Sequence, residues 1–259
     1  MKHTLLTLII ATSCLLCGAC ATKPTDPEQL KAYEANHDPL EPMNRGIFAF
    51  NNMFDAVILE PVAYGYRAVT TQTIRTGVTN FYDNMSEMRN IVNGTLQANG
   101  TKTANATKRF LANTFWGFFG LMDVASDMGI PKYDNDFGQT LAVWGWHTSD
   151  TYLVLPFFGP SNPRDVFGTM GNFITPPSIL ITCMTPWTSY PLNGVNYVQM
   201  RERAIEFLDN LHRSSADYYA TIRTMSQQNR QKVINDALGN VDQETPKQYE
   251  FDMEFDDFE

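Results

Sequence analysis

Apolar side chains recur at helical spacing over much of this chain. Between residues 38 and 58 they are separated by three or four positions, the period of one face of an α-helix, at Met43, Ile47, Phe50, Phe54, Val57 and Ile58. Asp38 and the prolines after it predict the start of this helix, and Pro61 predicts its end. The other face is rich in amides, with Asn44, Asn51, Asn52 and Asp55. Such a face could line a hydrated polar path, and simple exposure to solvent explains it equally well.

Three further segments have the same helical period. One begins near Thr73, with apolar positions at Ile74, Val78, Phe81 and Met85. A second runs from Thr103 to Phe119, and aromatic residues lie almost all round its second half, which requires lipid or protein on every side. The third predicts one long amphipathic helix beyond Met200, from its spacing of Ala204, Leu208, Leu211, Ser215, Tyr218, Ile222 and Met225.

Turn and loop signals separate these segments. Asn93-Gly94 and Asn99-Gly100 predict two turns that flank a short segment. From Asp136 to Asp165, β-branched and aromatic runs alternate with Gly and Pro, and we expect an irregular loop with short helices. The predicted fold class is therefore mainly α.

The first twenty residues have the organisation of a bacterial lipoprotein signal peptide. A basic start precedes an apolar run from Leu5 to Leu16, and the small pair Gly18-Ala19 stands directly before Cys20. The run is too short for a ~30 Å hydrocarbon core, which favours cleavage. We expect residues 1–19 to be removed, Cys20 to be lipidated and residues 20–37 to be a flexible tether. Ala21, rather than Asp, after the cysteine predicts the outer membrane. The alternative, a metal site at Cys14, Cys17 and Cys20, has no fourth ligand nearby.

Charge is distributed unevenly. The formal net charge of −9 argues against nucleic acid as a partner. Residues 239–259 form an acidic tail, predicted to be disordered, in which apolar and acidic residues alternate. The tail is either simply solvated or pairs as an extended strand with a basic partner.

Two long stretches carry no charge. No Asp, Glu, Lys or Arg occurs from residue 110 to 122 or from 166 to 200. Ordinary domains have about a quarter charged residues, so we expect an apolar cover here. Prolines interrupt the longest candidates for a spanning helix, which favours embedding in one leaflet over threading. The alternative is a soluble protein in which these stretches form the core.

Catalytic and metal-binding motifs are not found. The histidines outside the leader, His37, His147 and His212, are far apart, and no hydrolase or phosphate-loop pattern occurs. Asp136-Phe137-Gly138 is similar to the metal-binding tripeptide of kinases, but the sequence lacks the glycine loop, the strand lysine and the H-R-D motif that accompany it there. We expect no enzyme, metal or cofactor. A lipid hydrolase with Ser178 or Cys183 as nucleophile is a distant alternative, since no base stands at a familiar spacing.

A series of ordered motifs covers about residues 38 to 170. They are Asp38-Pro39-Leu40-Glu41-Pro42-Met43-Asn44-Arg45, Phe48-Ala49-Phe50-Asn51, Pro61-Val62-Ala63-x-Gly65-Tyr66, Arg75-x-Gly77-x-x-Asn80-Phe81, Arg109-Phe110-x-x-Asn113, Gly120-x-x-Asp123-x-Ala125, Asp136-Phe137-Gly138-Gln139-Thr140-Leu141 and Pro156-x-x-Gly159-Pro160-x-x-x-Arg164-Asp165. In order and spacing they resemble the MlaA (VacJ) outer-membrane lipoproteins. The segment Trp146-His147-Thr148-Ser149-Asp150 departs from the small, Gly-rich turn that is usual in that family.

The resemblance implies a ring-like bundle of amphipathic and apolar helices over residues 38–238, embedded in the inner leaflet of the outer membrane. It implies a conduit that carries mislocalised phospholipids toward the periplasm and maintains lipid asymmetry, with a porin trimer and a soluble MlaC-like periplasmic carrier as partners. A structural lipoprotein that only scaffolds porins is the main alternative.

Several polar residues are our candidates for the lipid path: Asn44, Arg45, Asn51, Asp136, Gln139, Arg164 and Asp165. Charges at membrane depth are costly and usually pair or line a polar passage. Arg164 is therefore expected either to pair with carboxylates near Asp165 or to meet a lipid phosphate as a bidentate donor.

Overall fold

The computed structural model describes residues 38–146, 151–174 and 186–239. The predicted signal peptide, Cys20, the tether and the acidic tail beyond Gly239 lie outside the described residues, as do His147–Asp150, Ser178 and Cys183. The described part is mainly helical, as predicted. None of its helices is both long enough and apolar enough to cross a membrane.

The first helical arm is longer than the sequence predicts. Helix α3 (Glu41–Phe54) continues through a π-helical turn, η1 (Asp55–Leu59), into α4 (Glu60–Val69). The prediction that Pro61 ends the helix is wrong, because Pro61 lies in the first turn of α4, where a missing N–H costs little. Asp38 is not the N-cap either. Leu40 holds that position, and Asp38 accepts a hydrogen bond from the Leu40 N–H (3.0 Å).

Helices α5 (Gln72–Leu96) and α6 (Gly100–Phe115) pack against each other as a pair. Thr71 and Asn99 cap their N-termini with side-chain oxygens. The turn predicted at Asn93-Gly94 is wrong, because both residues lie inside α5. A Cβ at Gly94 would lie 2.8 Å from Oγ1 of Thr103, so this glycine allows the two helices to approach closely.

The middle of the chain is more regular than predicted. Short helices α7 (Val124–Asp127) and α8 (Phe137–Val143) precede a two-stranded antiparallel hairpin, β1 (Leu153–Leu155) and β2 (Gly159–Ser161). Helix α9 (Pro163–Ile174) follows and packs on α8. The short helices agree with the prediction, but the hairpin was not predicted.

Three helices complete the described chain: α11 (Pro186–Arg203), α12 (Ile205–Ser214) and α13 (Tyr218–Leu238). The single long helix predicted beyond Met200 is wrong, because the backbone is extended at Ser215 and α13 starts anew at Asp217. The Asp217 side chain accepts a hydrogen bond from the Ala220 N–H and so caps α13.

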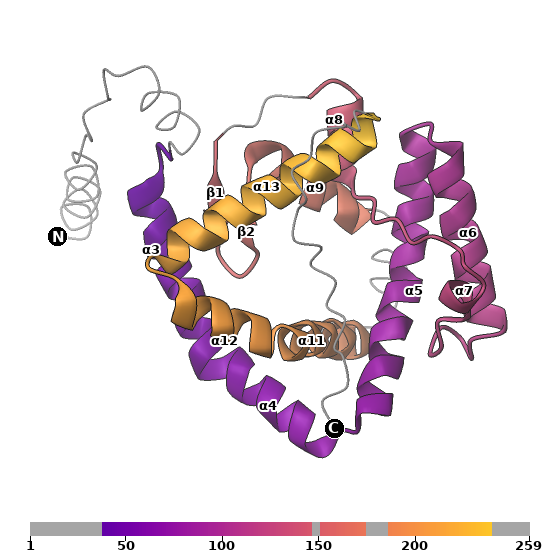
Figure 1. Ribbon diagram of the computed structural model, residues 1–259, viewed down its shortest axis with the longest axis horizontal. Coiled ribbons are helices and arrows are strands. Elements are labelled where there is room, and N and C mark those ends of the chain that lie inside the picture. Colours follow the sequence, from indigo (N-terminus) through magenta and orange to yellow (C-terminus); the bar gives the residue numbers. More distant parts are fainter. Residues whose placement is uncertain (1–37, 147–150, 175–185, 240–259) are drawn as a thin grey trace.

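The helices are arranged as a ring-like frame. In Figure 1 the α3–η1–α4 arm, α5 and α13 run along its sides, and α12 and α11 cross between them. Ion pairs fix α11 to the arm. Glu202 accepts a hydrogen bond from Arg67 of α4 (2.7 Å), and Arg201 pairs with Asp55 of η1 (2.7 Å). Glu202 also forms an ion pair with Arg75 of α5 (3.2 Å), which links α11 to α5.

Burial is inverted relative to an ordinary soluble protein. The buried apolar core is small and is centred on Tyr152, Val154 and Tyr219. Many fully or nearly fully buried side chains are polar, among them Asn44, Asn84, Glu87, Asn90, Asn93, Arg109, Asn113, Asn135, Gln139 and Thr140. The apolar positions predicted on the first helix largely face outward, since Met43 and Phe50 of α3 and Val57 and Ile58 of η1 are exposed. Large apolar side chains exposed in this number are typical of proteins that meet a partner or a membrane.

An exposed aromatic turn, residues 115–122, begins at the last residue of α6. The rings of Phe115, Trp116, Phe118 and Phe119 are 67–79% exposed. Phe118 and Phe119 adopt left-handed backbone angles (φ 49° and 59°), which cost a non-glycine residue about 1–3 kcal/mol. The turn is nevertheless anchored, because Asn80 of α5 donates a hydrogen bond to the Leu121 carbonyl oxygen (3.1 Å).

Candidate functional site

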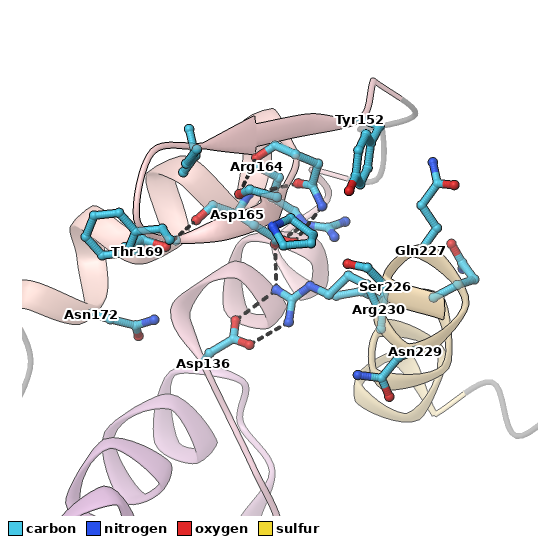
Figure 2. Close-up of a pocket in the computed structure, with 18 of the residues that line it drawn as sticks. Asp136, Tyr152, Arg164, Asp165, Thr169, Asn172, Ser226, Gln227, Asn229 and Arg230 are labelled. Carbon is cyan, nitrogen blue, oxygen red and sulfur yellow. Dashed lines mark hydrogen bonds and ion pairs between the residues drawn. The ribbon is translucent and has the colours of Figure 1, made fainter. Parts of the chain in front are cut away.

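A charged cavity of about 540 Å³ lies where the hairpin, α9 and α13 meet. The segment before α8 supplies Asp134 and Asp136, α5 supplies Arg89, and α9 supplies Arg164 and Asp165. Helix α13 adds the polar row Ser226, Gln227, Asn229, Arg230 and Gln231. Figure 2 shows Arg230 of α13 pointing toward Asp136, before α8, and toward Asp165 of α9.

Arg230 joins two elements that are far apart in sequence. Its Nη1 donates to Oδ2 of Asp136 (2.5 Å), and its Nη2 donates to Oδ1 of Asp136 (3.0 Å) and Oδ1 of Asp165 (2.5 Å). Burial opposes the charge of Asp136, but the hydrogen bonds and charge of Arg230 hold the pKa of that carboxyl below its ordinary value. The three side chains form a clamp between α8, α9 and α13, seen as dashed lines in Figure 2.

Local backbone geometry places both carboxylates. Asp136 is the N-cap of α8 and accepts a hydrogen bond from the Gln139 N–H (2.8 Å). Asn162 and Asp165 bond each other at the start of α9, through Asn162 Nδ2 to Asp165 Oδ2 (2.5 Å) and Asp165 N to Asn162 Oδ1 (2.9 Å). Gly138 leaves the space that the clamp occupies, since a Cβ there would lie 2.5 Å from Oδ1 of Asp165.

Arg164 is 4% exposed and lines the same cavity. Within the described residues its guanidinium makes one hydrogen bond, from Nε to Oδ1 of Asp165, and this bond is long (3.3 Å). The same Asp165 oxygen is already bonded to Arg230. Arg164 was expected to pair with carboxylates near Asp165, and its pairing is instead with Asp165 itself and is weak, so most of the guanidinium's donors are left for the cavity.

The predicted polar residues fall into two groups. Asp136, Arg164 and Asp165 line the cavity, and Gln139 lies beside it, donating from Nε2 to the Asp134 carbonyl oxygen (2.9 Å). The other three, Asn44, Arg45 and Asn51, lie on α3 and do not line it. A role in the lipid path stays a prediction for all seven.

The amides of α3 hold the hairpin. Asn44 donates from Nδ2 to the Tyr152 carbonyl oxygen (3.0 Å) and accepts from the Val154 N–H (2.9 Å). Asn51, two turns later, donates to the Leu155 carbonyl oxygen and accepts from the Phe157 N–H, both at 2.9 Å. The amide-rich face thus supplies backbone partners for β1.

Arg45 attaches α3 to α13. Its guanidinium bonds Asp217 (2.5 and 3.2 Å) and Glu41 (2.7 Å) and lies 4.4 Å from the ring centre of Tyr219. The pKa of Asp217 is lowered, first by the hydrogen bond from Arg45 and then by that from the Ala220 N–H. Arg45 therefore holds α3 against the N-terminus of α13.

The sequence did not single out Arg230, Arg89 or Tyr152 as site residues. The polar run Gln227–Gln231 on α13 is a signal that could have drawn attention to Arg230, but it names no partner. No group of three or more His, Cys, Asp or Glu side chains suited to a metal ion occurs among the described residues.

A helical frame with polar side chains inside, exposed apolar side chains outside and a charged cavity defines a mainly helical class of protein with an apolar interaction surface. The chain belongs to the MlaA lipoprotein family, whose model matches residues 36–233. The resemblance expected from the motifs over residues 38 to 170 is thus confirmed and extends further toward the C-terminus.

Named relatives and a solved structure agree with this membership. The chain is 32% identical over 231 residues to the "Intermembrane phospholipid transport system lipoprotein MlaA" of Escherichia coli (strain K12), covering 86% of this chain and 85% of that protein. It is 36% identical over 191 residues to an uncharacterized Rickettsia prowazekii protein, covering 73% and 74%. A structure solved under "Structural basis for maintenance of bacterial outer membrane lipid asymmetry" superposes with a TM-score of 0.66 at 30% identity, over 77% of this chain and all of that one.

Proposed function

We propose that this protein is a passive conduit that takes phospholipids mislocalised in the outer leaflet of the outer membrane and passes them toward a periplasmic carrier. The inverted burial carries this proposal. Exposed apolar side chains on α3, α4 and the aromatic turn suit contact with acyl chains, while amides and guanidinium groups inside suit a polar headgroup. Movement down a gradient through such a frame needs no nucleotide and no catalytic group.

The proposed location is the inner leaflet of the outer membrane. Cys20 would be lipidated there, and the folded domain would be partly embedded in that leaflet. The length and composition of residues 1–20 support the anchor, and Ala21 supports the outer membrane as destination. The proposed partners are phospholipid, a porin trimer and a soluble MlaC-like carrier. We propose no enzymatic activity, since the family's named members belong to a transport system.

The test compares a gene deletion with its parent for surface phospholipid, measured by acyl transfer from outer-leaflet phospholipid onto lipopolysaccharide. We expect the signal to rise in the deletion and to return to the parental level with the full gene. A Cys20→Ala variant, which cannot be acylated, should fail to restore it although the folded body is unchanged. Equal signals in deletion and parent would refute the conduit. If porin still copurifies in that case, the scaffold alternative would replace it.

A further inference from the structure

Two buried donors in the charged cavity lack adequate partners. Arg164 is 4% exposed and has one long bond. Tyr152 is 2% exposed, also lines the cavity, and its hydroxyl has no hydrogen-bond partner within the described residues. Buried polar groups are normally well bonded, so a guanidinium with one long bond and a hydroxyl with none, both on residues that line one cavity, indicate a missing acceptor.

The charges of the cavity show what that acceptor is. Three arginines and three aspartates line the cavity: Arg89, Arg164, Arg230, Asp134, Asp136 and Asp165. The carboxylates are nevertheless already occupied. Asp136 binds Arg230, Asp134 binds Arg89 (2.9 Å), and Asp165 binds Arg230 and Asn162. The most weakly paired charge is the guanidinium of Arg164, whose single ion pair within the described residues, with Asp165, is long (3.3 Å) and shares an oxygen with Arg230, so the missing group is an anion with several acceptor oxygens.

We propose that this cavity binds the phosphate of a phospholipid headgroup, with Arg164 and Tyr152 as its direct donors. The proposal rests on the proposed function and deepens it by naming a headgroup site along the path. A guanidinium offers two parallel N–H groups that match two phosphate oxygens. The cavity, at about 540 Å³, accommodates a headgroup. Arg230 is a positioning residue, because it holds Asp165 away from full pairing with Arg164.

The test uses the full chain in detergent and isothermal titration calorimetry with three probes. They are dihexanoyl phosphatidylethanolamine, dihexanoylglycerol, which lacks phosphate, and inorganic phosphate. Arg164→Gln should weaken binding of the phospholipid at least tenfold, and Arg164→Lys should weaken it less, because lysine keeps the charge but not the paired donors. Lys232→Gln is the matched control. It removes one positive charge from an exposed site on α13 that does not line the cavity, and it should leave affinity unchanged.

A second variant keeps the proposal testable if Arg164→Gln does not fold. Tyr152→Phe removes one hydroxyl that has no partner, so folding should be retained and phospholipid affinity should fall several-fold. Its control is Tyr66→Phe, because the Tyr66 hydroxyl is also buried without a partner but lies on α4. Both arginine and tyrosine variants should bind dihexanoylglycerol as the parent does.

Each of the remaining outcomes would overturn either the headgroup site or the proposed function. Phospholipid affinity equal to the parent's in both Arg164→Gln and Tyr152→Phe would overturn the headgroup site while leaving the conduit in place. Inorganic phosphate that displaces the lipid at equal concentration would assign the site to free phosphate instead and overturn it too. Absence of any lipid binding by the parent, together with unchanged surface phospholipid in the deletion, would remove the proposed function itself.

Discussion

Nε of Arg109 lies 2.9 Å from Oε1 of Glu87, and the two side chains are only 3% and 2% exposed. The same guanidinium binds both carboxylate oxygens of Asp123 (2.9 Å each) and the Ile130 carbonyl oxygen (2.7 Å). One buried cation therefore ties α5, α6 and the segment after the aromatic turn together. This network replaces the apolar core that would join these elements in an ordinary soluble protein.

Arg109→Met should destabilise the protein by about 3–5 kcal/mol, because it leaves Glu87 as an unpaired buried charge. The double variant Arg109→Met/Glu87→Leu should regain part of this loss. Urea unfolding in detergent measures both. As a control, Lys132→Met breaks the Lys132–Asp83 pair (2.8 Å), whose side chains are both exposed, and should cost less than about 1 kcal/mol. Equal losses in the Arg109 and Lys132 variants would contradict the role of the network.

Asn44→Ala should loosen the hairpin, because the Val154 N–H loses the side-chain oxygen to which it donates. We expect hydrogen exchange at the Val154 N–H to accelerate about tenfold, the equivalent of about 1.4 kcal/mol for one lost hydrogen bond. Asn52→Ala is the control. Asn52 is on the same helix but lines a different cavity, beside Asp55 and Arg201, and its loss should leave Val154 protected.

Acid should weaken the clamp around Arg230. The folded-state pKa of Asp136 is below its ordinary value of 3.8, so its stabilising effect is present above pH 3.8 and is lost as pH falls through the lowered value. Asp136→Asn should cost about 2 kcal/mol at pH 7, and the gap to the parent should close in strong acid. Urea unfolding over a pH series tests this. Asp134→Asn, which removes an exposed carboxylate from the same cavity, should differ little from the parent at every pH. A gap between Asp136→Asn and parent that did not change with pH would exclude the clamp as its cause.

The aromatic turn should insert into lipid. Phe118→Glu, made in a Cys20→Ala chain without acyl groups, should reduce partitioning into phospholipid vesicles at least tenfold, since burying one Phe contributes about 1.5–3 kcal/mol. Cosedimentation with vesicles gives the partition coefficient. Leu96→Glu makes the same kind of change at an exposed apolar side chain at the other end of α5 and serves as control. If Phe118→Glu and Leu96→Glu behaved alike, the turn would not be the inserted element.

Periodicity predicted the helices that start this domain but not how they end. The spacing of apolar positions located α3, α5 and α6, because each has one dominant face. It failed at residue 215, since Leu211, Ser215 and Tyr218 keep the helical spacing across the break. The hairpin escaped prediction because β1 is only three residues long and has its hydrogen-bond partners on α3, about a hundred residues earlier.

Only some of the residues that line the cavity could be predicted from the sequence. Arg164 and Asp165 drew attention because they are charges in a stretch almost without any, and Asp136 because it begins the Asp136-Phe137-Gly138 motif. Arg230 stands in an ordinary polar helix, 94 residues from Asp136, and only the packing of α13 on α8 brings the two together. The outward direction of the apolar face of α3 was equally hidden, because a periodic pattern defines a face without saying which side is inside.

The inverted burial has a thermodynamic consequence for the acyl-free chain in water. Unfolding normally raises the heat capacity by about 12–15 cal/mol/K per residue, because apolar groups become hydrated and outweigh the opposite effect of polar groups. Here many apolar rings already face outward, and the groups released from the interior are amides and ions. Scanning calorimetry should therefore give a heat capacity increment of unfolding well under that range. The free energy of unfolding should accordingly curve less with temperature than it does in an ordinary soluble protein.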